Sequence, residues 1–136
     1  MLKKLKSLEK EISTWKTTPY KHNPLHPEQR VLSTTSGHKV RSKSEALIDM
    51  VLYKNNISFR YEAELLLGES IFYPDFTIRH PHTGKTYYWE HFGMMDIPDY
   101  SKKALSKLQR YISFNIIPNI QLITTYETKI HLLALT

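Results

Sequence analysis

Hydrophobic side chains recur every three or four positions in three segments of the chain, a spacing that predicts amphipathic helices. These segments are residues 2–16, 40–56 and 99–115. The apolar stripe of the first helix consists of Leu2, Leu5, Leu8, Ile12 and Trp15, and its other positions are mostly charged or polar. Such a stripe needs a surface to pack against. We expect either the rest of this chain, a second copy in a homodimer, or a neighbour in a larger assembly.

The second predicted helix has recognisable boundaries. Ser42 and Ser44 are both candidate N-caps, because a serine hydroxyl can accept a hydrogen bond from a backbone N–H of the first turn. Asn55 and Asn56 end the hydrophobic spacing. This segment is therefore the best delimited helix of the chain.

Runs of β-branched, aromatic and aliphatic residues bounded by turn residues predict strands. The predicted strands are residues 57–67, 71–80, 85–93 and 119–127, with a weaker hairpin over 30–40 that turns at Ser36 and Gly37. Residues 128–135 are predicted to be one more strand or a short helix. The turn at 80–84 joins two strands into a hairpin, and the last helix can cross over to a parallel strand. The predicted fold is α/β, with a central mixed sheet of four to five strands flanked by helices.

Composition places this pattern in an ordinary globular chain of 136 residues. Three prolines between Pro19 and Pro27 cannot continue the first helix, so residues 1–29 are interpreted as an N-terminal helix with an extended connector and residues 30–136 as one domain. The absence of cysteine excludes disulfides, thiolate metal sites and cysteine nucleophiles. No apolar run approaches the length of a membrane span, so we expect a cytoplasmic protein without a membrane partner.

The net charge of +6 is unevenly distributed. Residues 1–43 contain ten Lys or Arg and three Glu, whereas residues 44–136 contain nine basic and ten acidic side chains. A basic N-terminal portion suits a polyanion such as nucleic acid, although a solvated basic face would have the same composition.

Three carboxylates stand out by their predicted positions. Glu45 lies in the first turn of the second helix, Asp75 follows Pro74 in a hydrophobic strand, and Glu90 lies on the strand predicted to pair with it. Each has an ordinary explanation: a helix-dipole contact, a turn, or a solvent-facing strand position. Together they suggest one patch, where ionised carboxylates would repel each other unless a hard dication such as Mg²⁺ or Mn²⁺ neutralised them. A dication so placed can activate water and stabilise a phosphoryl group, which points to phosphodiester cleavage.

These motifs resemble those of the PD-(D/E)XK nucleases, the restriction-endonuclease-like superfamily. The resemblance covers about residues 40–126 and rests on SKSE with Glu45, YPDF with Asp75 and YWEHFGMMD with Glu90, followed by KLxxY and LITTYET. It implies a restriction-endonuclease-like fold and Mg²⁺- or Mn²⁺-dependent hydrolysis of DNA. It also implies that Asp75 is the central metal ligand, Glu90 the second, and Glu45 a direct or water-mediated third.

The chain departs from the family at its lysine. The family places a lysine two residues after the second acid, where this chain has Phe92. The strand is expected to continue about 10 Å past Glu90. The chain then returns as a helix that rises about 1.5 Å per residue, and it is level with Glu90 again near Lys103 to Lys107. We predict that Lys107 replaces the missing lysine, with Lys103 as second choice; the alternative is that both are ordinary solvated lysines.

Three further residues are candidates for the site. His91 should face away from Glu90 on a regular strand, which favours a structural role, but a bulge near Gly93 would make it a candidate catalytic residue. Arg41 and Lys43 precede the second helix and are candidate phosphate contacts. The missing lysine keeps two alternatives open, a non-cleaving nucleic-acid-binding relative and an accessory subunit.

Overall fold

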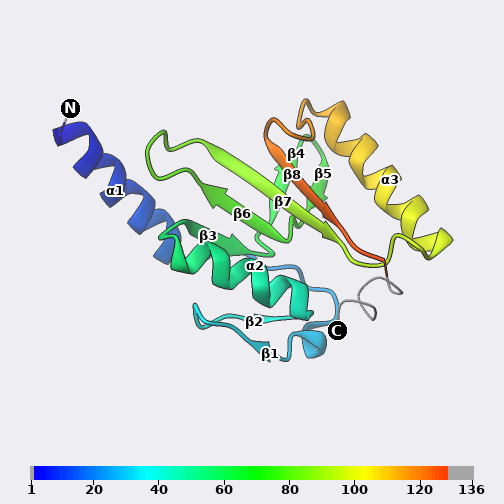
Figure 1. The fold of residues 1–136 in the computed structure, drawn as a ribbon. Helices are drawn as coiled ribbons and strands as arrows, with labels where there is room; N and C mark the ends of the chain where they lie inside the picture. Colours follow the sequence, from blue (N-terminus) through cyan, green and yellow to red (C-terminus); the bar gives the residue numbers. More distant parts are fainter. Residues whose placement is uncertain (1, 129–136) are drawn as a thin grey trace. The chain divides into compact units, whose positions relative to one another are not determined.

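The computed structural model describes residues 2–128, which form two compact units that divide between Tyr88 and Trp89. The first unit contains α1 (Leu2–Thr17), η1 (Pro27–Gln29), β1 (Leu32–Ser33), β2 (Lys39–Val40), α2 (Lys43–Lys54), β3 (Ser58–Tyr61), β4 (Leu65–Leu67), β5 (Ser70–Phe72) and β6 (Phe76–Arg79). β7 (Thr86–Phe92) begins in the first unit and ends in the second, which continues with α3 (Pro98–Ser113) and β8 (Leu122–Tyr126) (Figure 1).

The main sheet has four strands in the order β3-β6-β7-β8. β3 and β6 are antiparallel, with Ser58 opposite Arg79, and a turn between His80 and Lys85 leads from β6 into β7. β7 and β8 point the same way because α3 crosses over between them (Figure 1). The predicted α/β class with a mixed sheet is confirmed, and the hairpin at 30–40 is present as β1 and β2 with Gly37 at φ 94°.

Two predicted strands are each broken into two. Residues 57–67 were predicted to be continuous, but Glu62 has φ 51°, in the left-handed region, and the chain leaves the main sheet after Tyr61. Residues 71–80 break at Pro74, which has no N–H to donate to a strand ladder. The freed segments β4 and β5 pair with each other in a separate two-stranded sheet. Asp75 therefore lies in the bend before β6 and not inside a strand.

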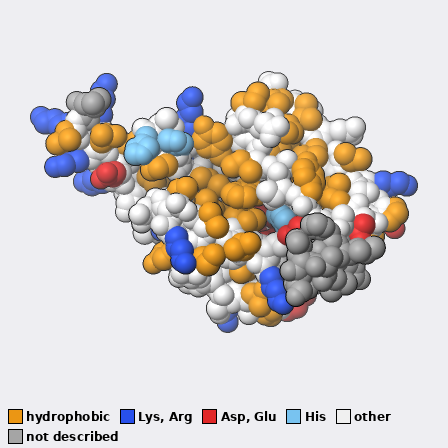
Figure 2. Space-filling model, viewed as in Figure 1, with side chains coloured by type: hydrophobic (Ala, Val, Ile, Leu, Met, Phe, Trp, Pro, Cys, Tyr) orange, Lys and Arg blue, Asp and Glu red, His pale blue; other side chains and the backbone are white. Residues whose placement is uncertain are grey.

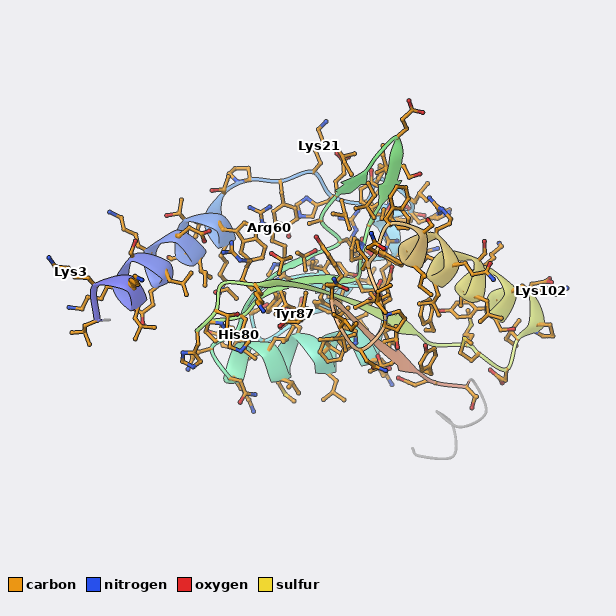
Figure 3. The ribbon with its side chains drawn as sticks, turned by 90° about the horizontal axis from the view of Figure 1, so that it is seen from above. Lys3, Lys21, Arg60, His80, Tyr87 and Lys102 are labelled. Carbon is orange, nitrogen blue, oxygen red and sulfur yellow. The ribbon has the colours of Figure 1, made fainter. Side chains whose placement is uncertain are left out.

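The stripe of α1 is packed along only part of its length. Ile12 is buried, the Arg60 guanidinium lies 4.5 Å from the centre of the Trp15 ring, and Arg60 lies between the end of α1 and the sheet (Figure 3). Leu8 meets the turn before β7, where a Cβ on Gly84 would come within 2.8 Å of its Cδ1. Leu2 and Leu5 are 71% and 38% exposed. The later half of α1 is thus packed on its own chain, and a homodimer through residues 2–16 stays a prediction.

Residues of the proline-rich connector are hydrogen-bonded to the first unit. The backbone N–H of Asn23 donates to the carbonyl of Glu62 at 3.0 Å, and that of Glu64 donates to the carbonyl of Lys21 at 2.8 Å. The connector is accordingly part of the same compact unit as α2 and β3. Within residues 2–128 no helix is long and apolar enough to cross a membrane. The element predicted at 128–135 lies outside the described residues, apart from its first position.

Candidate active site

Glu90 is a buried carboxylate held by two side chains of α3. It lies near the end of β7, is 2% exposed, and alternates with the half-buried Trp89 and His91. Lys107 Nζ lies 2.6 Å from Glu90 Oε2, and the Tyr111 hydroxyl donates to the same oxygen at 2.6 Å. The cation and the phenol compensate for the burial of the carboxylate, which alone would cost several kcal/mol.

The helix brings these two groups to Glu90 because they are one turn apart. Lys107 and Tyr111 are separated by four residues and therefore share one face of α3. Tyr111 is fully buried, whereas the Lys107 side chain keeps about a third of its surface exposed. Of the two lysines predicted to replace the missing one, the structure places Lys107 against Glu90 and leaves Lys103 exposed.

Phe92 occupies the position of the family's lysine and belongs to the core of the second unit. It is buried on the same side of β7 as Glu90, and its ring stacks with that of Tyr126 on β8 at a centroid distance of 5.6 Å. A lysine there would have to bury its ammonium group among aromatic rings. The cation beside Glu90 comes from α3 instead.

His91 is held by residues of β8 and its C-terminal extension. Thr125 Oγ1 accepts from the indole N–H of Trp89 at 3.0 Å and lies 2.6 Å from His91 Nδ1. The hydroxyl can both donate and accept, so it holds the Nδ1 side of the ring in either tautomer. Nε2 lies 2.8 Å from Glu127 Oε1. His91 is thus fixed apart from the Glu90 carboxylate, as expected for the next residue of a regular strand.

Glu45 caps α2. Ser42 is the N-cap, and its hydroxyl accepts from the Glu45 N–H at 3.2 Å; this decides between the two serines that were candidates. Glu45 Oε1 in turn accepts from the Arg41 N–H at 2.9 Å and from the Tyr61 hydroxyl at 3.0 Å. The SKSE motif therefore works as a capping box whose glutamate reaches one residue further back than usual.

Burial raises the pKa of Glu45, more than its hydrogen bonds from Arg41 and Tyr61 lower it. A raised pKa means that the folded protein holds the proton more tightly than the unfolded chain, so folding is favoured below the ordinary pKa of 4.5 and this contribution is lost as the pH rises through the folded value. At neutral pH the ionised Glu45 costs stability. Residues that cost stability are typical of functional sites.

We expect Glu45→Gln to be more stable than the wild type at neutral pH, because the amide oxygen keeps both acceptor contacts and removes the buried charge. The advantage should shrink below pH 4.5, where both proteins are uncharged at this position. Urea unfolding at pH 4 and pH 7 measures both. A variant less stable than the wild type at pH 7 would show that the ionised carboxylate is a net stabilising cap.

Arg41 is committed to the protein itself. Its Nε donates to Glu62 Oε2 at 2.7 Å and its Nη2 to Oε1 at 3.1 Å, while further N–H groups donate to the carbonyls of His26 and Leu25. These contacts fasten the connector to the start of α2 and give Arg41 a structural role, and its phosphate contact stays a prediction. Lys43, the first residue of α2, is exposed and stays a candidate phosphate contact.

Asp75 is half-buried in the bend between β5 and β6. Its backbone carbonyl accepts from the N–H of Glu62 at 3.0 Å, which ties this bend to the break after β3. The two irregular points of the first unit thus support each other.

The carboxylates of the site bear on whether it can hold a metal. Among residues 2–128, no three His, Asp or Glu side chains converge closely enough to form a metal cage made of protein alone. Mg²⁺ ordinarily uses one or two carboxylates, with waters and substrate phosphates completing its shell. A carboxylate such as Glu90 is a suitable ligand for Mg²⁺. Both donors described above approach Oε2 of this carboxylate. The donor set therefore fits a hard dication held by few protein oxygens.

Two polar clusters were missed by sequence reasoning. Tyr111 was assigned to the apolar stripe of α3, and only its four-residue spacing from Lys107 signals a polar role. Asp49 on α2 is fully buried and accepts from the Ser36 hydroxyl at 2.6 Å, while His38 Nδ1 lies 2.7 Å from the same hydroxyl. The serine proton points to Asp49, not to His38, so this cluster fastens the β1–β2 turn to α2 and does not activate a nucleophile.

Comparison of the chain with protein-family models, with curated proteins and with solved structures finds no match.

Proposed function

We propose that this protein is a metal-dependent nuclease that hydrolyses phosphodiester bonds of DNA. The observation that carries the proposal is the buried Glu90–Lys107 pair. Its cation comes from the helix on which a substitute for the lysine missing at Phe92 was predicted. The resemblance to PD-(D/E)XK nucleases supplies the reaction class. A restriction-endonuclease-like arrangement of the α/β fold is part of this proposal.

Energetics favour a chemical role for the pair. Buried ion pairs contribute little net stability, because desolvation of the two charges offsets their attraction, and an apolar pair of similar volume serves folding equally well. The rest of the inner face of α3 is apolar or aromatic, with Ala104 and Tyr111 buried. A charged pair at this one position, with its lysine partly open to solvent, is therefore better explained by chemistry than by packing.

Each residue then has a definite task. Tyr111 donates to Oε2 and fixes the orientation of the Glu90 carboxylate. Lys107 carries a positive charge at the edge of the buried region, where its ammonium can donate to a phosphoryl oxygen or to the attacking water. A bound Mg²⁺ would supply Lewis acidity and a more acidic water. In the reaction a water oxygen bonds to phosphorus as the bond from phosphorus to the leaving sugar oxygen breaks. Asp75 and Glu45 stay the predicted further metal ligands.

The basic N-terminal portion supports DNA as the substrate. Lys3, Lys4 and Lys6 are exposed on α1, and Figure 2 shows basic side chains around this end of the helix. Contacts of this kind bind the phosphate backbone without reading its sequence, so we expect little sequence specificity and steep salt dependence.

A second candidate is a nucleic-acid-binding protein or accessory subunit that does not cleave. One observation favours it: Glu90 Oε2 already has a cation and a hydroxyl as partners, so the pair is electrostatically satisfied without a metal. The exposed Leu2 and Leu5 would then form part of a contact within a DNA-processing assembly.

Cleavage assays separate the two candidates. We expect the wild type to cut linear, branched or single-stranded DNA in Mg²⁺ or Mn²⁺ and to be inactive in a chelator. Asp75→Asn should abolish cleavage, whereas Asp99→Asn, the same change at an exposed carboxylate, should not. A wild type that binds these DNAs and cuts none of them would establish the non-cleaving candidate.

A further inference from the structure

One flank of α3 carries three basic residues in line with the Glu90–Lys107 pair. Lys103, Lys107 and Arg110 are spaced by four and three residues, which places them on one side of the helix. At about 100° per residue, Lys103 lies only about 40° around the helix axis from Lys107. Lys103 and Arg110 are both exposed, so the flank extends from the buried pair outward to the surface.

Lys102 provides a contrast in the same turn. It lies about 160° around the helix from Ala104, which is buried on the inner face, and Figure 3 shows it pointing into solvent near the beginning of α3. Lys102 and Lys103 are thus adjacent in sequence and equal in charge, but they occupy different sides of the helix.

The dimensions of the flank match those of a nucleic-acid strand. From Lys103 to Arg110 the helix rises about 10 Å, and one strand of duplex DNA presents a phosphate about every 3.4 Å along its axis. The flank therefore spans about three phosphates. Its middle member, Lys107, is the residue that contacts Glu90.

We propose that this flank, Lys103, Lys107 and Arg110, binds the DNA backbone and leads the strand that is cut to Glu90. Lys103 is then a substrate-positioning residue, not a replacement for the missing lysine. The inference rests on the proposed function for the identity of the ligand. The inference adds which surface of the protein binds the DNA strand and along which side of α3 that strand runs.

Binding is measured in a chelator, so that no cleavage occurs, with a fluorescent 20-base-pair DNA and the matching single strand at 30 and 300 mM salt. We expect Lys103→Ala to weaken binding to the probe that the protein prefers and to lower the magnitude of the salt slope by the value of one phosphate contact, about 0.9 on the duplex or about 0.7 on the single strand. The ratio of wild-type to variant affinity should then grow about eightfold on the duplex, or about fivefold on the single strand, between 300 and 30 mM salt. Lys103→Arg should restore both values, and Lys102→Ala should match the wild type.

Equal losses in Lys102→Ala and Lys103→Ala would overturn the inference, because they would show a general effect of charge. Unchanged binding in Lys103→Ala, or no binding of either DNA by the wild type, would also overturn it. The readout is independent of the proposed function: a protein that never cleaves can still distinguish the two lysines, and an active nuclease can fail to do so. Both positions are exposed, so neither variant should lose the fold, and circular dichroism checks this.

Discussion

Lys107→Ala is expected to lower the cleavage rate by about 10²–10³-fold, the usual cost of losing one electrostatic contact to a transition state. The same change should destabilise the protein, because it leaves the Glu90 carboxylate buried with only the Tyr111 hydroxyl as its described donor. Breaking a buried pair costs about 3–5 kcal/mol. Lys107 is about one-third exposed, so we expect about 2–3 kcal/mol from urea unfolding.

The matched control is Lys102→Ala, which removes the same charge from an exposed position of the same helix. It should leave both the cleavage rate and the unfolding midpoint unchanged. If Lys107→Ala lost stability but kept full activity, Lys107 would be a structural partner of Glu90 and would have no part in the reaction.

Glu90→Gln should abolish cleavage while changing the free energy of unfolding by less than about 1 kcal/mol. Activity would then be lost without a loss of the fold. Glutamine has the shape of glutamate, and its amide oxygen can still accept from Tyr111. Lys107 loses its ion pair with Glu90 but can turn its partly exposed ammonium toward water. The measurements are the cleavage rate in Mn²⁺ and the urea midpoint at the same pH.

Glu69→Gln, at an exposed carboxylate, is the control for the loss of a negative charge. An active Glu90→Gln protein would rule out Glu90 as a catalytic ligand and would leave its pairing with Lys107 as a feature of folding. Together with Lys107→Ala, this variant separates the two roles: the lysine change affects activity and stability, and the glutamate change affects activity alone.

Periodicity identified the helices and the fold class, but not where the strands break. The break at Pro74 could have been read from the sequence, since proline cannot donate to a strand ladder. The break at Glu62 had no local signal. Glu62 has a left-handed backbone, and its buried side chain pairs with Arg41, 21 residues earlier in the chain. Which half of α1 is packed was equally hidden, because Leu8 and Trp15 meet Gly84 and Arg60.

The site was predictable where element lengths alone decide the outcome. The length of the strand beyond Glu90 and the rise of the helix narrowed the choice to Lys103 and Lys107, and the structure places Lys107 beside Glu90. Tyr111 was not found, because a tyrosine on the buried face of a helix looks like core. The contacts of Arg41 within the protein were hidden from the sequence, because the carbonyls and the carboxylate that it contacts come from segments 15–21 residues away.

The most direct test of the central claim is to measure Mn²⁺ binding by calorimetry, without nucleic acid, to the wild type and to Glu90→Gln. The proposed nuclease should bind Mn²⁺ with a measurable heat, and Glu90→Gln should lose that binding while it stays folded. Equal binding by both proteins, or none by the wild type at millimolar Mn²⁺, would contradict the assignment of Glu90 as a metal ligand.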